Sequence, residues 1–443
     1  MQIKEWIEEN KAGLIRDVCA LTKIQSVSSP GEGGWPFGTG CRQVLEKALS
    51  LAEEMGLETE NHENYCGSAV LRGETGEELG FFSHLDVVPE GNGWTVTQPY
   101  IPLIKDGWIY GRGSADNKGP AVAALYTMKY FKENNIPLRH TLRQFFGCDE
   151  ERGMEDIKYY LEHHNPPSFS LVPDAAFPVC CGEKGRYQIV CEARISDDII
   201  SIKGGEGINS VPSKAEISLK KAGGEAVTAS GRSAHAAKPE TGENAIVKLA
   251  GHLIQNGLLG EADRKTFCFL SEALADYYGT GLKIDCKDEA SGPLTVVASM
   301  LESTECAGTI RLYLDLRYPV TADTDRIESG IKRAAGSYGW KVIKMEHNPS
   351  FYMDKESSTV KMLTDLCSRV YGRPFEPFCM GGGTYARKLP NAVGYGPGLS
   401  FQKKPCEDGH GRGHQPDECV CIENLVKAVE IYINAVMELD KII

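Results

Sequence analysis

Two histidines and four acidic residues, spread over most of the chain, are of the types that bind divalent metal ions in proteins. In chain order they are His84, Asp116, Glu150, Glu151, Asp174 and His414. Imidazole nitrogens and carboxylate oxygens form a ligand set suited to zinc, and the number of carboxylates also suits manganese or cobalt. These residues predict a divalent metal site.

Asp86 and the adjacent pair Glu150-Glu151 have features that such a site can use. Asp86 lies two residues beyond His84, where its carboxylate can accept a hydrogen bond from the imidazole nitrogen that does not face the metal, which fixes the tautomer. Two adjacent carboxylates repel each other unless a cation lies beside or between them. In an irregular turn one of them can bind the metal while the other holds a water as general base.

Asp116 lies in the segment Tyr110–Pro120, which reads Tyr-Gly-Arg-Gly-Ser-Ala-Asp-Asn-Lys-Gly-Pro. Its glycines allow backbone conformations that are closed to other residues, and Pro120 can open a helix because its missing N–H would have no helical partner there. The segment therefore predicts a carboxylate held at a loop-to-helix junction. Seen alone, an acid at such a junction is usually a helix cap, so the other motifs decide its role.

The elements that must position these residues alternate between helices and strands. Apolar periodicity predicts helices at 3–21, 41–56, 120–134 and 155–164, and strands at 79–82, 141–148 and 169–172. Such alternation is typical of a largely parallel sheet flanked by helices, where ligands gather beyond the carboxyl ends of the strands. His84, Glu150, Glu151 and Asp174 follow strands closely, so we expect one cleft to hold them.

Residues 183–352 have a different character. Alternating strand-like segments lie at 186–193, 215–219, 294–299 and 309–316, with helical patterns at 244–256 and 324–335. This arrangement predicts an antiparallel sheet with helices to one side. We expect an α+β lid domain at 183–352, inserted into an α/β catalytic domain that is formed by 1–182 and 353–443.

Composition limits the kinds of partner and the cellular compartment that we expect for this protein. A length of 443 residues favours two domains, and the net charge of −13 argues against a nucleic-acid partner, which favours a small-molecule substrate. The charged N-terminus lacks the apolar stretch of a signal peptide, and no segment approaches the length of a membrane span. The 15 cysteines are scattered without a Cys-x-x-Cys pair, so we expect a reduced, cytoplasmic protein without membrane attachment.

Five segments occur in the order of the motifs of a known enzyme family. They are Ser83–Pro89, Tyr110–Pro120, Asp149–Gly153, Val172–Asp174 and Gly413–Glu418. Together they resemble the motif series of the co-catalytic zinc peptidases, which include aminoacylase, acetylornithine deacetylase, succinyl-diaminopimelate desuccinylase, carnosinase and glutamate carboxypeptidases. Within that family the sequence resembles the PepV-like dipeptidases most closely.

The resemblance implies two divalent metal ions, zinc or alternatively manganese or cobalt. It places His84 and Asp174 on one ion, Glu151 and His414 on the other, and Asp116 between them as a bridge. A pair of ions about 3.5 to 4 Å apart can activate a shared water and polarise the scissile carbonyl.

For the remaining catalytic residues, the resemblance implies that Glu150 is the general base that activates the metal-bridging water and that Asp86 orients His84. It also implies a cis peptide bond between Asp116 and Asn117.

The family also implies substrate contacts from both predicted domains. The resemblance assigns His235 to the carbonyl oxygen of the transition state, Asn209 to the lid side of the site, and Arg317 to the substrate carboxylate. A guanidinium fork suits a carboxylate because it donates two parallel hydrogen bonds. Thr384 and Arg387, which follow a glycine cluster, are further candidates for the same end of the substrate.

The activity that the resemblance implies is hydrolysis of dipeptides with a free N-terminus. An N-acyl-amino-acid deacylase or a succinyl-diaminopimelate desuccinylase of the same fold is the first alternative, and a non-catalytic metal-binding homologue is the second. Because the predicted lid is longer than that of the family's dimeric members, the resemblance implies a monomer.

Overall fold

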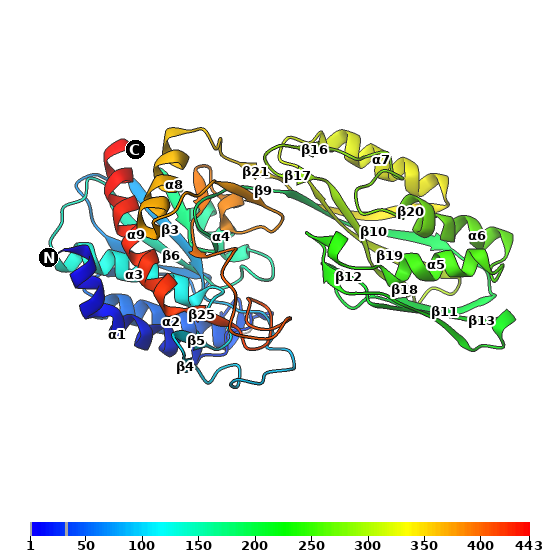
Figure 1. Ribbon diagram of the computed structural model, residues 1–443, viewed down its shortest axis with the longest axis horizontal. Helices are drawn as coiled ribbons and strands as arrows, with labels where there is room; N and C mark the ends of the chain where they lie inside the picture. Colours follow the sequence, from blue (N-terminus) through cyan, green and yellow to red (C-terminus); the bar gives the residue numbers. More distant parts are fainter. Residues whose placement is uncertain (1, 32–33) are drawn as a thin grey trace. The chain divides into compact units, whose positions relative to one another are not determined.

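The computed structural model describes residues 2–31 and 34–443, which form two compact units. Unit 1 contains the described residues up to Cys181, together with Met353–Phe378 and Gly383–Ile443. Unit 2 contains Gly182–Tyr352 and Cys379–Gly382. Unit 2 therefore interrupts unit 1 in the sequence, and Figure 1 shows the elements of each.

Unit 1 is built on a mixed sheet whose order runs β1-β2-β6-β3-β7-β23-β9. The central pairs β6·β3, β3·β7 and β7·β23 are parallel, whereas β1·β2, β2·β6 and β23·β9 are antiparallel. The bounds are Glu58–His62, Cys66–Leu71, Glu78–His84, Thr141–Gly147, Phe169–Val172, Cys180–Glu183 and Ala392–Gly394 for β1, β2, β3, β6, β7, β9 and β23. A mixed sheet flanked by helices is confirmed, and its parallel pairs lie at the centre.

Helices cover both faces of this sheet because neighbouring strand residues point to opposite sides. The Phe81 ring lies 5.4 Å from Tyr432 of α9, and the Phe82 ring lies 6.1 Å from Tyr160 of α4. The helices of unit 1 are α1 Ile3–Thr22, α2 Gly38–Glu54, α3 Lys118–Glu133, α4 Glu155–His163, α8 Ser358–Tyr371 and α9 Ile422–Ile442. The first four lie within a few residues of the helices that apolar periodicity predicts at 3–21, 41–56, 120–134 and 155–164.

A small antiparallel sheet joins segments from distant parts of the chain. It contains β4 Leu103–Lys105, β5 Trp108–Tyr110 and β25 Cys419–Cys421, in the order β25-β5-β4. Tyr110 pairs with Cys419, so the loop after β5 begins beside the end of the loop that precedes β25. These two loops carry Asp116 and His414.

Unit 2 has a seven-stranded sheet in the order β14-β13-β11-β18-β19-β10-β20, with antiparallel neighbours (Figure 1). Residues of β10 alternate between buried and partly exposed, which is the pattern of a sheet with one covered face. The bounds are Gly185–Arg194, Ile199–Gly204, Lys214–Leu219, Ala226–Ser230, Thr295–Ser303, Thr309–Tyr318 and Trp340–Asn348 for β10, β11, β13, β14, β18, β19 and β20.

Three helices pack against this sheet through one apolar core. They are α5 Ala245–Gln255, α6 Glu261–Cys268 and α7 Thr324–Ser337, and the core includes Leu249, Phe267 and Ile331. Asn244 caps α5 by accepting the N–H of Ile246 at 2.9 Å, which satisfies an otherwise unpaired donor of the first turn. Unit 2 also contains a two-stranded ribbon of β12 Ser210–Val211 and β15 Ala234–His235.

The remaining elements are short. They are β8 Ala175–Ala176, β16 Lys287–Asp288, β17 Gly292–Pro293, β21 Phe351–Tyr352, β22 Phe378–Met380, β24 Pro397–Gly398, η1 Lys220–Ala222, η2 Pro239–Thr241, η3 Phe269–Ala273 and η4 Tyr385–Lys388. Most of the fifteen cysteines are buried. Within the described residues, no helix combines the length and the apolar character needed to cross a bilayer.

Candidate metal centre and active site

Asp116 contacts two histidines that are far apart in the sequence. Its Oδ1 lies 3.0 Å from His84 Nε2, and its Oδ2 lies 3.3 Å from His414 Nε2. A second acid approaches the same Nε2 atom of each histidine, Asp174 at 3.7 Å from His84 and Glu151 at 2.9 Å from His414. The centre thus consists of two imidazole–carboxylate halves that share one carboxylate.

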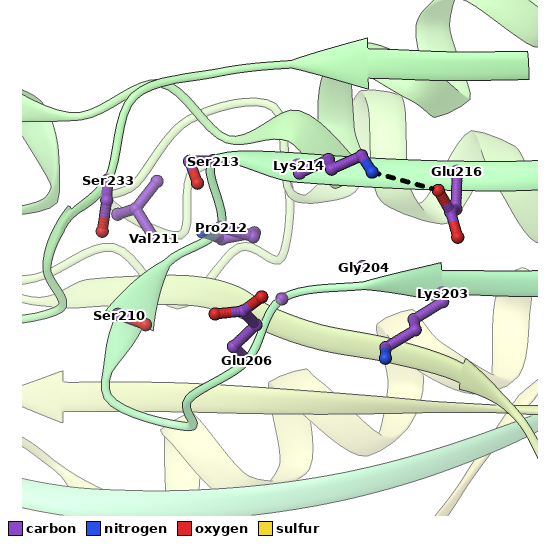
Figure 2. A pocket seen from close by; sticks show the side chains of 11 residues that line it. Lys203, Gly204, Glu206, Ser210, Val211, Pro212, Ser213, Lys214, Glu216 and Ser233 are labelled. Atoms are coloured by element: carbon purple, nitrogen blue, oxygen red, sulfur yellow. Dashed lines mark ion pairs between the residues drawn. The ribbon is translucent and has the colours of Figure 1, made fainter. Parts of the chain in front are cut away.

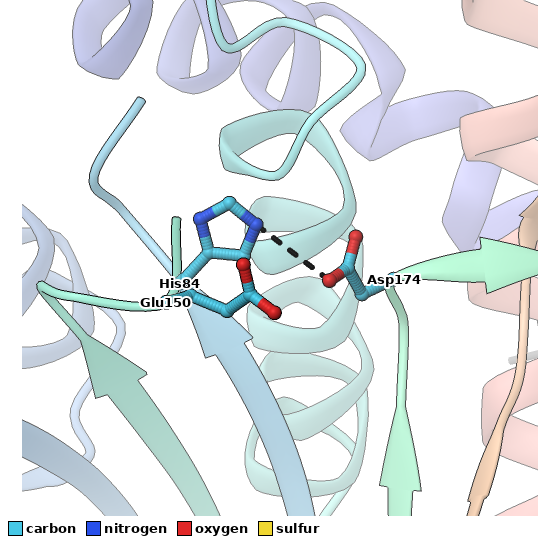
Figure 3. Close-up of side chains that lie close together, drawn as sticks. All are labelled: His84, Glu150 and Asp174. Carbon is cyan, nitrogen blue, oxygen red and sulfur yellow. Dashed lines mark ion pairs between the residues drawn. The ribbon is translucent and has the colours of Figure 1, made fainter. Parts of the chain in front are cut away.

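Ligand atoms in this centre are close enough to surround a metal ion. One group, His84, Glu150 and Asp174, places one atom from each residue within 4.8 Å of the others, and Figure 3 shows these side chains directed toward one another. A second group, His84, Asp116 and Glu151, satisfies the same limit. Imidazole and carboxylate donors are the ligands that zinc prefers in hydrolytic sites, so the residues fit a divalent ion.

The parallel sheet places several of these residues at one edge. His84 is the last residue of β3 and pairs with Gly147, the last residue of β6. Glu150 and Glu151 follow β6 by a few residues, and Asp174 follows the end of β7 at Val172. Because the carboxyl ends of parallel strands meet at the same edge, these side chains converge there.

The loop that carries Asp116 is held by an acid from the C-terminal part of the chain. Glu418 Oε1 accepts the N–H groups of Ala115 and Asp116, each at 3.0 Å. Its other oxygen accepts a 2.6 Å hydrogen bond from Arg112, and both side chains of this ion pair are buried. Glu418 lies four residues after His414, so one carboxylate connects the two loops of the centre.

Close approach of these loops depends on glycine. A Cβ at Gly413 would lie 2.7 Å from Asp116 Oδ2, and Gly113, at φ 84°, has a conformation that L-residues rarely adopt. The peptide bond between Asp116 and Asn117 is cis, which confirms the expectation for that bond. Asn117 then donates to the carbonyl of Pro173 at 2.6 Å and to Asp174 at 3.2 Å.

Asp86 is fully buried and contacts both His84 and the turn after β6. His84 Nδ1 lies 3.0 Å from the carbonyl oxygen of Asp86 and 3.4 Å from its carboxylate, so the residue faces the imidazole with both groups. Its carboxylate oxygens also accept the N–H groups of Glu150 and Glu151 at 3.2 and 3.1 Å. Sequence spacing predicts the first of these contacts but gives no sign of the second.

Electrostatics in the centre follow from crowding of acids around two imidazoles. Hydrogen bonds to Asp116 and Glu151 raise the pKa of His414 to about 11. Burial opposes the ionised form of Asp116, but hydrogen bonds from His414 and His84 dominate and lower the pKa of its carboxyl. Such a cluster of negative charge strongly favours a bound cation.

Glu150 is a partly buried acid among these side chains. Burial raises its pKa, and the neighbouring carboxylates of Asp174 and Glu151 raise it further. A carboxyl group with a raised pKa binds a proton more tightly than an ordinary glutamate does, as proton transfer near neutral pH requires. Burial likewise raises the pKa of Glu151, which the hydrogen bond from His414 opposes.

In unit 2, the structure places Asn209 and His235 beside each other. Ser210 pairs with His235 in the β12·β15 ribbon, and Ala236 donates its N–H to the carbonyl of Asn209 at 2.9 Å. Both Asn209 and His235 are exposed. A cavity of about 190 Å³ lies next to this ribbon, lined among others by Ser210 and Ser233 (Figure 2).

Arg317 is buried near the end of β19, where its guanidinium is already engaged. Its Nε donates to Asp315 at 3.0 Å, and one terminal nitrogen donates to the carbonyl of Gly381 at 2.5 Å. Asp315 also accepts hydrogen bonds from Arg186. The guanidinium of Arg317 is therefore fixed in direction by a buried acid.

Thr384 and Arg387 lie in unit 1. Thr384 directly precedes the short helix η4, and Arg387 lies within it. The Thr384 hydroxyl accepts the N–H of Ala386 at 3.1 Å and caps this short helix. A Cβ at Gly383 would lie 2.3 Å from Arg387 Cζ, so the guanidinium packs on a backbone that only glycine permits. The structure thus gives Thr384 a local structural contact in addition to its predicted role.

Fold and site together define a class, the metal-dependent hydrolases with a parallel-sheet catalytic unit. The sequence profile of peptidase family M20/M25/M40 matches residues 80–438, which is most of the chain, and the chain belongs to this family. It is a metallopeptidase, which hydrolyses peptide bonds with the help of divalent metal ions.

Similar proteins agree with this membership. A putative dipeptidase, YtjP, of Bacillus subtilis (strain 168) is 31% identical over 466 residues, covering 97% of this chain and 98% of the relative. A beta-Ala-Xaa dipeptidase of Lactobacillus delbrueckii subsp. lactis is 29% identical, covering 100% and 99%. The structure of YXEP from Bacillus subtilis, described as a dinuclear metal binding peptidase from the M20 family, has a TM-score of 0.56 at 12% identity, covering 98% and 100%.

Proposed function

We propose that this chain is a dinuclear metal-dependent dipeptidase that cleaves dipeptides with a free N-terminus. The observation that carries the proposal is the position of Asp116, whose two oxygens face His84 and His414 separately. A carboxylate placed in this way can bridge two ions. The relatives named as dipeptidases support the substrate class.

In this proposal His84 and Asp174 hold one ion, Glu151 and His414 hold the other, and Asp116 bridges them. The ions are zinc, or manganese or cobalt, which the same donors accept. When bound, the two ions polarise the scissile carbonyl and lower the pKa of the attacking water. The distances from His84 to Asp174 and from His414 to Glu151 support this division into two halves.

Glu150 is the general base in this proposal. It takes a proton from the attacking water and later gives it to the amine that leaves. Its raised pKa supports this role, because a more basic carboxylate accepts a proton from water more readily than an ordinary glutamate does. Asp86 keeps Glu150 in position through the backbone amide that it accepts.

Substrate contacts complete the proposal. His235 stabilises the carbonyl oxygen as it becomes negative, with Asn209 beside it, and Arg317 pairs with the substrate carboxylate. The exposed ribbon that carries His235 and Asn209 supports their access to a ligand, and the fixed guanidinium of Arg317 supports directional recognition. Thr384 and Arg387 contribute to binding the same carboxylate.

The test compares hydrolysis of one dipeptide with that of its N-acetylated form. The protein is stripped of metal and then reloaded with zinc, manganese or cobalt. We expect metal-dependent cleavage of the free dipeptide alone. Cleavage of the acyl group alone would identify an N-acyl-amino-acid deacylase, and further trials with succinylated diamino acids would identify a desuccinylase. Metal binding without hydrolysis of any of these substrates would identify a non-catalytic homologue.

We further propose that the enzyme is a cytoplasmic monomer in which residues 183–352 form the lid domain. The free thiols support a reducing compartment. Light scattering of the metal-loaded protein tests the monomer, and an obligate dimer would contradict it. Limited proteolysis tests the lid, because a separate domain should be released as a stable fragment near these boundaries.

A further inference from the structure

A second buried acid, Asp156, accepts hydrogen bonds from the backbone of the turn that carries Glu150 and Glu151. Asp156 Oδ2 accepts the N–H of Cys148 at 2.6 Å and that of Asp149 at 2.8 Å. Asp86 accepts hydrogen bonds from the next two backbone N–H groups, those of Glu150 and Glu151. All four consecutive amides at 148–151 therefore point at buried carboxylates, and Asp156 holds the first half of the turn.

Asp156 is completely buried in the first turn of α4. Its Oδ1 accepts the N–H of Ile157 at 2.7 Å, and the positive end of the helix favours a carboxylate at this position. A third donor reaches Oδ2, the hydroxyl of Tyr385. The side chain thus accepts four hydrogen bonds, which favour its ionised form, whereas burial and the neighbouring Asp86 raise its pKa to about 7.

Tyr385 belongs to η4, far along the chain, and is also buried. Its ring packs edge-on against Phe145 at 5.5 Å and lies 6.5 Å from the His84 ring. A Cβ at Gly147 would lie 1.9 Å from the Tyr385 hydroxyl and 2.5 Å from Asp156 Oδ2. The Tyr385 hydroxyl and the Asp156 carboxylate therefore fill the space beside Gly147, so only glycine fits at the end of β6.

We propose that Asp156, held by Tyr385, is a positioning residue for the general base. It fixes the backbone at 148–149 as Asp86 fixes it at 150–151, and so determines where the carboxylates of Glu150 and Glu151 lie. This inference rests on the proposed function, because it takes Glu150 as the base and Glu151 as a metal ligand. Asp156 itself touches neither substrate nor metal.

Asp156→Asn is the first test. An amide has one acceptor oxygen and one NH₂ group. It therefore cannot accept a hydrogen bond from Ile157 on one side and three more, from Cys148, Asp149 and Tyr385, on the other. We expect kcat for a dipeptide to fall about 100-fold with KM changed less than about threefold, since a displacement of about 1 Å costs this much. We also expect the affinity for zinc, titrated calorimetrically into the metal-stripped protein, to fall about tenfold.

Two further variants serve as comparisons. Tyr385→Phe removes one of the donors to Asp156 and keeps the ring, so kcat and zinc affinity should fall in the same direction but by only a few-fold. Glu155→Gln removes an exposed acid from the same helical turn, where its side chain pairs with Lys158. This matched control should leave kcat and zinc affinity within about twofold of the wild type.

Thermal unfolding shows whether each variant is folded, and only folded variants are interpreted. A folded Asp156→Asn protein with kcat and zinc affinity both within twofold of the wild type would overturn the proposal. If Asp156→Asn does not fold, Tyr385→Phe decides, and wild-type values for both quantities would overturn the proposal equally. If the wild type binds zinc but cleaves no dipeptide, the proposed function fails, whereas the zinc titrations of the variants still decide the positioning role.

Discussion

The two halves of the candidate centre are built from different kinds of structure. His84 ends a central strand, is 1% exposed and has its second nitrogen against Asp86. His414 lies in an irregular loop, has a φ of 66° and leaves half of its side chain exposed. The first half is therefore fixed by the sheet, whereas the second depends on contacts made by one long loop.

Those loop contacts are few but specific. Asp417 accepts the N–H groups of Thr95 and Val96 at 2.9 and 2.8 Å and also contacts His410 at 2.8 Å, while Glu418 holds the Asp116 loop. The comparison teaches that one centre can combine a half fixed by a sheet with a half that is assembled from loops. Substitutions can leave both halves intact, disturb one half, or weaken both together.

The largest effect is expected from Glu150→Ala, which should leave both halves intact. The variant should retain its bound metal, because no other ligand depends on this side chain, yet lose about 10²- to 10⁴-fold in kcat, because the water loses its base. Metal analysis and steady-state kinetics on the same sample measure the two quantities. Turnover close to that of the wild type would show that Glu150 is not the base.

The next test compares His84→Ala with His414→Ala in metal-stripped protein. Removing the buried imidazole of His84 leaves the carboxylates of Asp86, Asp116 and Asp174 facing one another, so we expect a loss of about 3 to 5 kcal/mol in the free energy of unfolding. Removing the half-exposed imidazole of His414 should cost less, because solvent screens the charges of Asp116 and Glu151 there. Urea unfolding measures both, and equal losses would contradict the difference between the halves.

Glu418→Gln should weaken both halves together. The glutamine still accepts a hydrogen bond but leaves Arg112 without its partner charge, so the loop of Asp116 is held less firmly. We expect the affinity for zinc to fall about 10- to 100-fold, as for other residues that orient metal ligands. Glu423→Gln, an exposed acid five residues later, is the control and should bind zinc normally. Wild-type affinity in Glu418→Gln would mean that the halves are held by other contacts.

The smallest effect concerns pH. In metal-stripped protein the pKa of His414 is raised from its ordinary 6.5 to about 11, so the folded state holds this proton more tightly than the unfolded state. The stabilisation is complete below about pH 6.5 and is lost as pH rises toward 11. Unfolding at pH 6.5 and pH 10 should therefore show a larger loss in the wild type than in His414→Ala. Equal losses would contradict this.

Much of the unit 1 fold could be predicted because its patterns are local. The helix that ends at Thr22 and the strand that ends at His84 have the apolar spacing of their class, and the loop residues follow directly. Strand β20 is different, because its side chains are mostly exposed and polar. An edge strand of this kind has little apolar alternation, so sequence periodicity does not single it out.

In the site, motif order could be predicted but support from distant residues could not. Asp116 and His414 lie in recognisable motifs, whereas the contacts of Asp156 with Tyr385 and of Glu418 with Arg112 join residues that are hundreds of positions apart. A buried acid in a sequence looks like any surface acid. Only the fold reveals which amides it accepts and how it positions the neighbouring ligands.

Pairing of β5 with β25 has a consequence for protein synthesis. The strand before Asp116 is completed by a strand from the last residues of the chain, and that same C-terminal region supplies His414 and Glu418. A nascent chain that has emerged only as far as residue 352 contains His84 and Glu150 but lacks these partners. Because the proposed centre needs His414, we expect a nascent chain of this length to hydrolyse no dipeptide.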